Sequence, residues 1–245
     1  MNFASRTHLL LLKDNVATKW LPTNIDGCVL WLRSDLGVTK DGDNLVSAWA
    51  DQRGQGGYVF QATQNLKPTF VSSYALFNNC PSIAFTNEDF MSVHPIIEGE
   101  SLTLFCVLRM SAAQINGYSH LLSNSIDGNY LGESLDLSFL NMSIYDDGSQ
   151  NFEIPTDLGL AGDDDPHIIC FSLNISDSIS IYVNGGIIEE ASDISAGSWT
   201  PLWDTIFGGY CETYQCAEIL IYNSILSDPN RLLVENYLNG RYVIY

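Results

Sequence analysis

The sequence predicts an all-β protein, built as a two-sheet antiparallel jelly-roll β-sandwich with one C-terminal helix. Three observations predict this class. Short runs of β-branched and aromatic residues alternate with turn residues from Gly27 onward, and one helical pattern follows the last of these runs. The 245 residues are enough for one large sandwich that needs no metal or disulfide to hold its core. We expect roughly 11 to 14 strands and no second domain.

The clearest pair of strands lies in residues 178–192, SISIYVNGGIIEEAS. Ile179, Ile181 and Val183 alternate with the residues between them, so their side chains point to one face of a strand. Asn184 and Gly185 follow as a strong hairpin-turn signal. The segment therefore predicts a hairpin with one buried face.

The closing segment, residues 216–245, predicts a strand followed by a capped helix. Residues 217–222 form a β-branched and aromatic run. Ser227 stands where an N-cap belongs, Asp228 and Pro229 occupy the first turn, and Gly240 is expected to end the helix. A lone helix after many strands is expected to pack against the edge of the sandwich. Its apolar face is expected at four positions with helical spacing: Leu232, Leu233, Tyr237 and Leu238.

Nine motifs share one order and spacing along residues 25–245. They are VLWL (29–32), WADQRGQG (49–56), KPTFV (67–71), PSIAF (81–85), DFM (89–91), LTLFCV (102–107), IYVNG (181–185), IFGG (206–209) and residues 216–245. In this order and spacing the chain resembles the concanavalin A-like, laminin-G-like jelly-roll domains of lectins, bacterial surface proteins and phage structural proteins. The resemblance implies the fold. It does not imply one function, because this fold carries lectins, hydrolases and structural modules.

Charge narrows the classes of partner. Twenty-nine acidic residues against ten basic ones give a formal charge of −19, which repels an extended phosphate backbone or an anionic membrane surface. We therefore expect no nucleic-acid partner, whereas cations and neutral glycans stay compatible. Solubility alone also accounts for such acidity.

Residues 1–24 lie outside the resemblance. Leu9 to Leu12 is the longest apolar run near the start, and it is too short for a signal-peptide core or a membrane span. We expect synthesis in the cytoplasm and no membrane insertion. The segment is either an edge strand of the sandwich or a docking arm that buries its leucines against another protein.

The six cysteines suggest thiols more than disulfides. Cys28, Cys106 and Cys170 lie within apolar strand patterns, where buried free thiols are expected, and Cys80 precedes a proline in a loop. The remaining pair, Cys211 and Cys216, is spaced so that a disulfide could join two ends of a tight loop. Synthesis in the cytoplasm favours the reduced pair.

The glycine-rich segment WADQRGQGG, residues 49–57, is expected to be structural. It lacks the glycine spacing of nucleotide-binding motifs. Asp51 is expected to accept hydrogen bonds from the backbone of its own turn, and Trp49 is expected to anchor the loop to the core. Arg53 departs from the resembled pattern, which usually has a small residue there.

Calcium is the cofactor that the resemblance implies most often, and it requires six to eight oxygen ligands. The best candidate ligands lie in two acidic turns, and each turn could equally be a solvated loop. A further acidic run occupies residues 163–165. The candidate ligands are Asp127, Asn129, Asp146 and Asp147.

The acidic residues do not predict a hydrolase. A glycoside hydrolase needs two carboxylates beside the scissile bond. Glu133 and Asp136 are three residues apart on an expected strand, which places them on opposite faces. Glu189 and Glu190 are adjacent and also face apart, and Glu218 is expected to hydrogen-bond within the closing segment. The sequence therefore predicts no enzyme and no catalytic residue.

Aromatic residues in expected loops could stack on sugar rings. Two of the four, the tryptophans, could instead pack in the core. The candidate ligand-binding residues are Tyr118, Tyr130, Trp199 and Trp203.

The sequence as a whole predicts a non-catalytic recognition or assembly module that could bind glycans. The main hypothesis is a homo-oligomeric phage virion protein, such as a capsid decoration, head fibre or tail component, attached to other virion proteins through residues 1–24. The alternatives are a glycan-binding adhesin or lectin in the extracellular space or at a cell surface, and a glycoside hydrolase.

Overall fold

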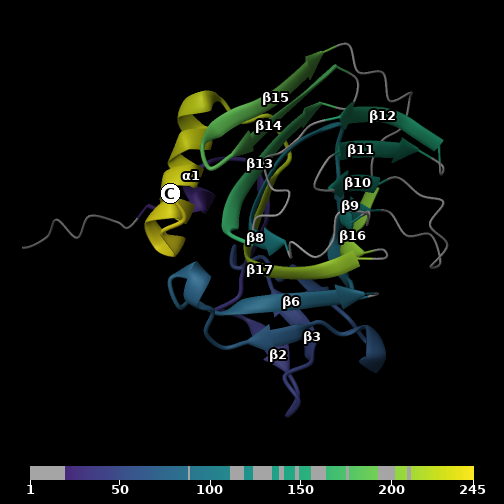
Figure 1. Cartoon of the computed structure of the whole chain (residues 1–245), viewed down its shortest axis with the longest axis vertical. Coiled ribbons are helices and arrows are strands. Elements are labelled where there is room, and N and C mark those ends of the chain that lie inside the picture. Colours follow the sequence, from purple (N-terminus) through teal and green to yellow (C-terminus); the bar gives the residue numbers. More distant parts are fainter. Residues whose placement is uncertain are drawn as a thin grey trace, which may run out of the picture.

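The computed structural model describes residues 20–87, 89–110, 119–123, 134–137, 141–146, 149–155, 164–174, 177–192, 202–208 and 211–245. Over these ranges it confirms a sandwich of two antiparallel sheets with one C-terminal helix (Figure 1). The described ranges hold 17 strands, so the expected count was too low. Part of the difference comes from three-residue strands that sequence patterns do not resolve.

One sheet has eight strands in the order β15-β14-β13-β8-β17-β6-β5, and β1 also pairs with β17. Its strands are β1 (Cys28–Arg33), β5 (Thr69–Val71), β6 (Ser82–Asn87), β8 (Ser101–Met110), β13 (Pro166–Asn174), β14 (Ser178–Val183), β15 (Gly186–Ser192) and β17 (Cys211–Tyr222). The single helix is α1 (Asp228–Tyr242).

The other sheet has nine strands in the order β12-β11-β10-β9-β16-β7-β4-β3-β2. Its strands are β2 (Val38–Lys40), β3 (Val46–Ala50), β4 (Tyr58–Phe60), β7 (Met91–Glu98), β9 (Ser119–Ser123), β10 (Ser134–Leu137), β11 (Asn141–Asp146), β12 (Ser149–Pro155) and β16 (Leu202–Gly208). Three short 3₁₀ turns complete the fold: η1 (Pro22–Asn24), η2 (Gln64–Leu66) and η3 (Ala75–Phe77).

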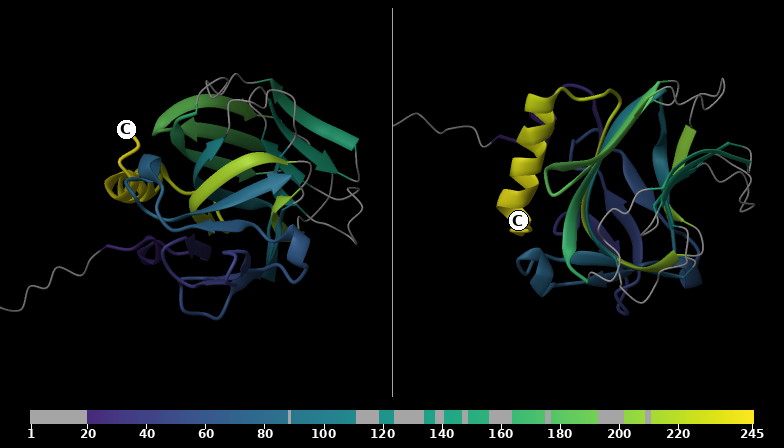
Figure 2. Two further views of the ribbon diagram at one scale, coloured as in Figure 1. Left: turned by 60° about the horizontal axis from the view of Figure 1, so that its bottom comes forward. Right: turned by 45° about the horizontal axis from the view of Figure 1, so that its top comes forward.

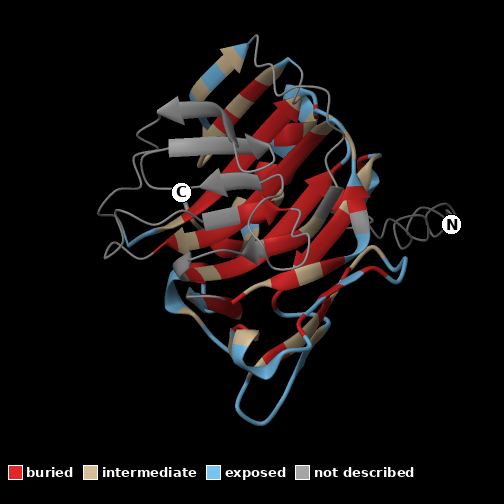
Figure 3. Ribbon diagram, turned by 90° about the vertical axis from the view of Figure 1, so that its right-hand side faces the viewer, coloured by how far each residue is buried: buried red, intermediate tan, exposed pale blue. Residues whose placement is uncertain are grey.

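The main core lies between the two sheets, where buried residues line the facing surfaces (Figure 3). A second apolar cluster lies on the outer face of the eight-stranded sheet, beneath α1 (Figure 2). The helix thus covers the face of a sheet and not the predicted edge, because the central strands carry apolar residues on both faces. Strand β8 serves both clusters, because Leu104 and Cys106 face the main core while Phe105 and Val107 face the helix. A strand covered on both faces reads as a continuous apolar run, as β8 does.

The predicted hairpin is confirmed. Ile179 and Ile181 are buried in the main core, and Val183 packs against it. The turn residues Asn184 and Gly185 have φ values of 52° and 79°. Both values lie in the left-handed region that this tight turn requires.

Helix α1 begins after Ser227, as predicted, but it continues past Gly240 to Tyr242. The predicted end was therefore wrong. Tyr242 is buried, and its packing favours one more stretch of helix over the conformational freedom of Gly240. The helix ends at Val243, whose φ of 55° is left-handed and whose N–H donates to the carbonyl of Asn239.

The apolar face predicted for α1 was only partly right. Leu238 is buried, but Leu232 and Leu233 are exposed. Their places toward the sheet are taken by Arg231 and Glu235, which form an ion pair in which Nη1 of Arg231 donates to both carboxylate oxygens, at 2.7 and 2.8 Å. The helix therefore buries polar side chains and exposes leucines. The complete buried set is Arg231, Val234, Glu235, Leu238 and Tyr242.

Residues 20–24 pack against the helix side of the sandwich. The ring of Trp20 lies 5.9 Å from the ring of Tyr237, centroid to centroid. The hydroxyl of Tyr222 donates to the carbonyl of Pro22. The run Leu9 to Leu12 falls outside the described residues.

The proposed loop between Cys211 and Cys216 does not exist, because both residues belong to strand β17. Five residues of strand span about 16 Å, whereas disulfide-linked Cα atoms lie within about 7 Å. Cys216 is a buried free thiol. Among the other expected thiols, Cys106 is buried and Cys28 is partly buried, and burial raises the pKa of Cys28 to about 12.

Candidate functional site

The candidate ligands chosen from sequence stay predictions. Asp146 is the last residue of strand β11, and Trp203 lies in strand β16 and not in the predicted loop; of these two residues only the backbone is described. Among the described residues, no three His, Cys, Asp or Glu side chains gather as a metal site. The remaining candidates lie outside the described residues: Tyr118, Tyr130, Trp199, Asp127, Asn129 and Asp147.

Most of the other acidic residues considered as catalytic or calcium-binding candidates are also not described in full. Glu133 and Asp163 lie outside the described ranges, and Asp136 is described only by its backbone in β10. No helix in the described part of the chain is long and apolar enough to cross a membrane.

The glycine-rich loop is structural, as expected. Asp51 accepts hydrogen bonds from the backbone N–H of Trp31 at 3.0 Å and of Arg53 at 3.1 Å. Its other oxygen accepts from Nε of Arg53 at 2.7 Å. A Cβ added at Gly57 would lie 3.0 Å from that oxygen, so a glycine fits best there. Trp49 is fully buried and anchors the loop.

Arg53, which the resemblance left without an explanation, completes this arrangement. Its guanidinium pairs with Asp51 and also donates to the carbonyl of Cys28 at 3.0 Å. The arginine thus fastens the loop to the first strand. Its role is to hold the loop, since both partners belong to the fold itself.

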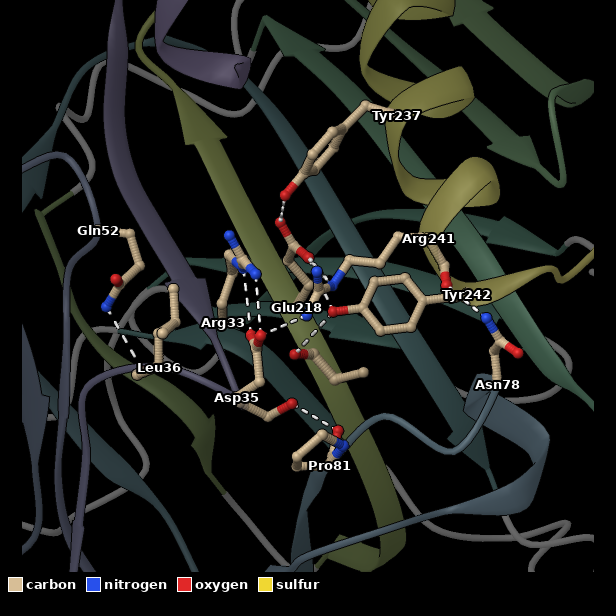
Figure 4. A network of polar contacts seen from close by, with 12 residues as sticks. Arg33, Asp35, Leu36, Gln52, Asn78, Pro81, Glu218, Tyr237, Arg241 and Tyr242 are labelled. Atoms are coloured by element: carbon tan, nitrogen blue, oxygen red, sulfur yellow. Dashed lines mark hydrogen bonds and ion pairs between the residues drawn. The ribbon is translucent and has the colours of Figure 1, made fainter. Parts of the chain in front are cut away.

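Glu218 is the most deeply buried carboxylate among the described residues, with no exposed surface. One oxygen accepts from the indole Nε1 of Trp31 at 2.7 Å and from the hydroxyl of Tyr237 at 3.0 Å. The other accepts from the hydroxyl of Tyr242 at 2.7 Å (Figure 4). The expected hydrogen-bonding role of Glu218 is confirmed, although the sequence did not reveal these partners.

Charged residues continue this network toward the surface (Figure 4). Nε of Arg241 lies 3.7 Å from Glu218, and its Nη2 lies 2.5 Å from Asp35, which also pairs with Arg33 at 2.9 Å. Burial raises the pKa of Glu218. Burial acts to raise the pKa of Asp35 as well, but its bonds to Arg33 and the charge of Arg241 outweigh that effect and lower it.

A raised pKa in a carboxylate often indicates a catalytic acid, but such a residue must reach a substrate. Glu218 cannot do so, because it is enclosed and already accepts three hydrogen bonds. We therefore assign it a structural role: it joins β17, β1 and α1.

A surface cleft of about 580 Å³ lies where α1 ends, and Leu76, His167, Asn184 and Val243 contribute to its lining. The amide nitrogen of Asn184 lies 3.1 Å from Nδ1 of His167. The amide oxygen of Asn184 accepts from the backbone N–H of Ile168 at 3.0 Å, so the nitrogen donates to the histidine. These polar groups bind one another and fix the hairpin turn over the sheet.

A third region combines aromatic side chains with exposure. Tyr58 and Phe60 lie on β4 on either side of Val59, which is fully buried, so both rings point away from the core. They are 39% and 36% exposed, and their ring centroids are 5.7 Å apart. The His94 ring on β7 lies 5.3 Å from Tyr58. We call Tyr58, Phe60 and His94 the aromatic surface.

The residues that pair with Tyr58 and Phe60 on strand β3 are too small to cover their rings. On β3, Ala50 pairs with Tyr58 and Ala48 pairs with Phe60, and alanine has no side chain long enough to cover a ring. On β7, Ser92 pairs with Phe60 and supplies a hydroxyl. An exposed aromatic face beside hydroxyl and imidazole groups can stack on the C–H face of a sugar and bind its hydroxyls.

Sequence reasoning missed the aromatic surface because it looked for stacking residues in loops. The signal was present in the triplet Tyr58-Val59-Phe60, in which two aromatic residues flank a β-branched one. Alternation predicts that Tyr58 and Phe60 share a face. The pairing of β4 with β7, which brings His94 to the same face, could not be read from that triplet.

The comparisons with known proteins bear on the fold. No protein-family model matches the sequence, and no curated protein sequence matches it. Three matched structures are a botulinum neurotoxin serotype D ligand-binding domain in complex with N-acetylneuraminic acid, the binding domain of Paraclostridial Mosquitocidal Protein 1, and a botulinum neurotoxin type C structure whose description concerns cell entry through two ganglioside molecules.

These matches are distant in sequence. The identities are 15%, 14% and 15%, and the TM-scores are 0.59, 0.58 and 0.59, in the same order. The matches cover 88%, 86% and 88% of this chain but only 52% of each matched chain. The chain thus spans about half the length of these solved proteins, and what it shares with them is an all-β sandwich fold.

Proposed function

We propose that this protein is a non-catalytic recognition module that binds neutral glycans through the aromatic surface. The observation that carries the proposal is the pair of exposed, neighbouring rings of Tyr58 and Phe60 beside His94. The N-acetylneuraminic acid and ganglioside ligands named for two of the matched toxin structures support a search among glycans. Both ligands are acidic, so the choice of neutral glycans rests on the charge of this chain alone. They do not identify the site, since the match spans only half of each toxin domain.

Charge favours neutral glycans over anionic ones. The chain carries a formal charge of −19, so a sulfated or sialylated chain meets repulsion that a neutral polysaccharide does not. Calcium held by Asp127, Asn129, Asp146 or Asp147 could offset this repulsion locally, and it stays part of the proposal.

Binding without hydrolysis is supported by what the buried carboxylates do. Asp51 is committed to Arg53 and to backbone N–H groups, and Glu218 to Trp31, Tyr237 and Tyr242. Each of these two carboxylates holds a segment of the fold in place. Neither belongs to an open pair flanking a substrate.

We also propose that the chain is a concanavalin A-like, laminin-G-like domain and a structural protein of a phage virion. The order and spacing of its nine sequence motifs support the family. A virion would display the protein in many copies, so that weak single-site binding would become effective through avidity. The competing proposal is a cell-surface adhesin. Mass spectrometry of purified virions, with host envelope fractions as the comparison, separates the two.

The test of the site is binding to a panel of neutral and acidic polysaccharides, with and without a chelator. Tyr58→Ala/Phe60→Ala should weaken binding at least about tenfold, which corresponds to about 1.4 kcal/mol. Tyr245→Ala is the matched control, because Tyr245 is an exposed aromatic residue elsewhere on the protein. Equal losses in both variants would remove the aromatic surface from the proposal. Binding to no glycan would overturn the glycan function.

The same incubations test for catalysis when reducing ends are followed over time. No release of reducing sugar is expected. Sustained release that disappears when one carboxylate is replaced would establish a hydrolase instead. A loss of binding on chelation would locate calcium at the ligand, and Asp127→Asn and Asp146→Asn would then be the next variants.

A further inference from the structure

The outer face of helix α1 exposes apolar side chains. Leu232 and Leu233 are 43% and 45% exposed, and Ile225, just before the helix, is 46% exposed. The opposite side of the helix is buried against the eight-stranded sheet. Adjacent exposed leucines on a helix offer a surface that gains from being covered. We call Ile225, Leu232 and Leu233 the helix face.

The N-terminal chain enters the fold directly beside this face. The Trp20 ring packs 5.9 Å from that of Tyr237, and Leu21 packs against the same apolar cluster. Tyr237 lies one helical turn after Leu233, so the two side chains are neighbours on the helix. The described chain thus begins beside Tyr237, one helical turn from Leu233 of the helix face.

Residues 1–19 have the composition to cover the helix face. They include the apolar run Leu9 to Leu12, flanked by Arg6 and Lys13. They hold three of the ten basic residues and one of the twenty-nine acidic residues. The rest of the chain therefore has seven basic against twenty-eight acidic residues. A short basic, apolar segment is attached to a strongly acidic body, and opposite charges favour their contact.

Length permits a contact with another copy. From Tyr237 back to Asp228 the helix rises about 14 Å, at 1.5 Å per residue. From Trp20 back to Leu12, eight extended residues span about 26 Å. The arm is therefore long enough, at full extension, to place its leucines beyond the end of its own α1.

We propose that Leu9 to Leu12 of one copy bind the helix face of a second copy, so that the protein forms a homo-oligomer by exchange of N-terminal arms. Two bodies of such high negative charge repel each other, and the basic arm brings cationic groups to the contact. The leucine run then buries the exposed side chains of α1. The proposal concerns a surface separate from the aromatic surface and does not depend on glycan binding.

The experiment uses two full-length variants, each missing one half of the contact. Leu10→Asp/Leu11→Asp disables the arm, and Leu232→Asp/Leu233→Asp disables the helix face. Leu36→Asp is the matched control, because Leu36 is also 43% exposed but lies outside the helix face. Light scattering with size-exclusion chromatography gives the mass, and circular dichroism shows whether each variant keeps its β-structure.

The wild-type protein and Leu36→Asp should have the mass of at least two chains. Each double variant should have the mass of one chain. Mixing the two double variants should restore a heteromeric species, since one supplies the arm and the other the face. High salt should weaken association several-fold, because it screens the charge contribution.

Several results would overturn the proposal. These are a monomeric wild type at 200 µM, an oligomer that survives either double variant, or no species formed on mixing. If an aspartate variant loses its β-structure, Leu232→Gln/Leu233→Gln replaces it, because glutamine is a good helix former. A contact within one chain would give monomers throughout and would also contradict arm exchange.

Discussion

Two buried carboxylates, Asp51 and Glu218, each accept a hydrogen bond from Trp31, one from its backbone and the other from its side chain. Asp51 accepts from the backbone N–H of Trp31 at 3.0 Å, and Glu218 accepts from its indole Nε1 at 2.7 Å. Their other partners differ. Asp51 has the guanidinium of Arg53 at 2.7 Å, whereas Glu218 has neutral hydroxyl donors and a guanidinium no nearer than 3.7 Å.

The difference shows that burial alone does not say what a carboxylate contributes. At Asp51 the negative charge itself stabilises the fold, because it compensates the charge of the largely buried guanidinium of Arg53. At Glu218 the accepting oxygens are used, because three neutral donors converge on them. Loss of charge should therefore matter more at Asp51, and loss of the whole side chain should matter most at Glu218.

The largest effect is expected for Glu218→Ala. It leaves the indole of Trp31 and the hydroxyls of Tyr237 and Tyr242 without their acceptor in a buried site, and it opens a cavity. We expect a loss of about 4 kcal/mol in the free energy of unfolding, measured by urea denaturation. Glu100→Ala, at an exposed position, is the control and should stay within about 0.5 kcal/mol of wild type. Equal effects in both variants would refute a structural role for Glu218.

An intermediate effect is expected for Asp51→Asn. The amide keeps one accepting oxygen but removes the charge that pairs with Arg53, so the guanidinium stays buried without its partner. We expect a loss of about 2.5 kcal/mol in the same measurement. The double variant Asp51→Asn/Arg53→Ala should lose less than the two single variants combined, because they share one interaction. Strict additivity would mean that the ion pair contributes nothing.

The smallest effect is expected for Glu218→Gln, about 1 kcal/mol at pH 7, because an amide can still accept from neutral donors. Its pH dependence is the sharper test. Burial raises the pKa of Glu218 in the folded state, so its contribution to stability is fully present below the unfolded pKa of about 4.3 and is lost as pH rises through the folded pKa. The penalty of the variant should therefore be larger at pH 4 than at pH 7.

Asp35 also changes the stability of the protein with pH, but in the opposite direction to Glu218. The pKa of Asp35 is lowered in the folded state, so its contribution is lost as pH falls, in wild type and variant alike. Most of the contribution of Asp35 then cancels in the difference between the two proteins, and what does not cancel comes through Arg241, which contacts both carboxylates. A penalty that grows with pH would mean that the folded pKa of Glu218 is lowered.

These examples also show what the sequence could predict. Arg53, which bonds Asp51 through its backbone N–H and its guanidinium, lies two residues away, so a local pattern was enough to predict that Asp51 holds its own turn, although not its bond from Trp31. Trp31 lies 187 residues from Glu218, and no local pattern connects them. The hairpin at residues 178–192 was predictable for the same local reason, whereas the pairing of β4 with β7 that completes the aromatic surface was not.

In helix α1 a prediction from local spacing was wrong because contacts with distant residues decide which side chains are buried. Spacing of apolar residues predicted that Leu232 and Leu233 face the sheet. Instead Arg231 faces it, because its guanidinium lies 3.8 Å from the ring of Tyr182 and pairs with Glu235. A long side chain with two such partners can compete with leucine for a buried position.

The position of β17 along the chain has a consequence for how the protein is made. This strand lies between β8 and β6 and also pairs with β1, yet it comprises residues 211–222 of 245. During synthesis, β8, β6 and β1 therefore each have an unpaired edge until residues 211–222 have emerged. Exposed strand edges invite pairing with other chains, and pairing between distant segments is slow. A nascent chain that stops before residue 211 lacks the centre of a sheet, and we expect aggregation to begin at that stage of synthesis.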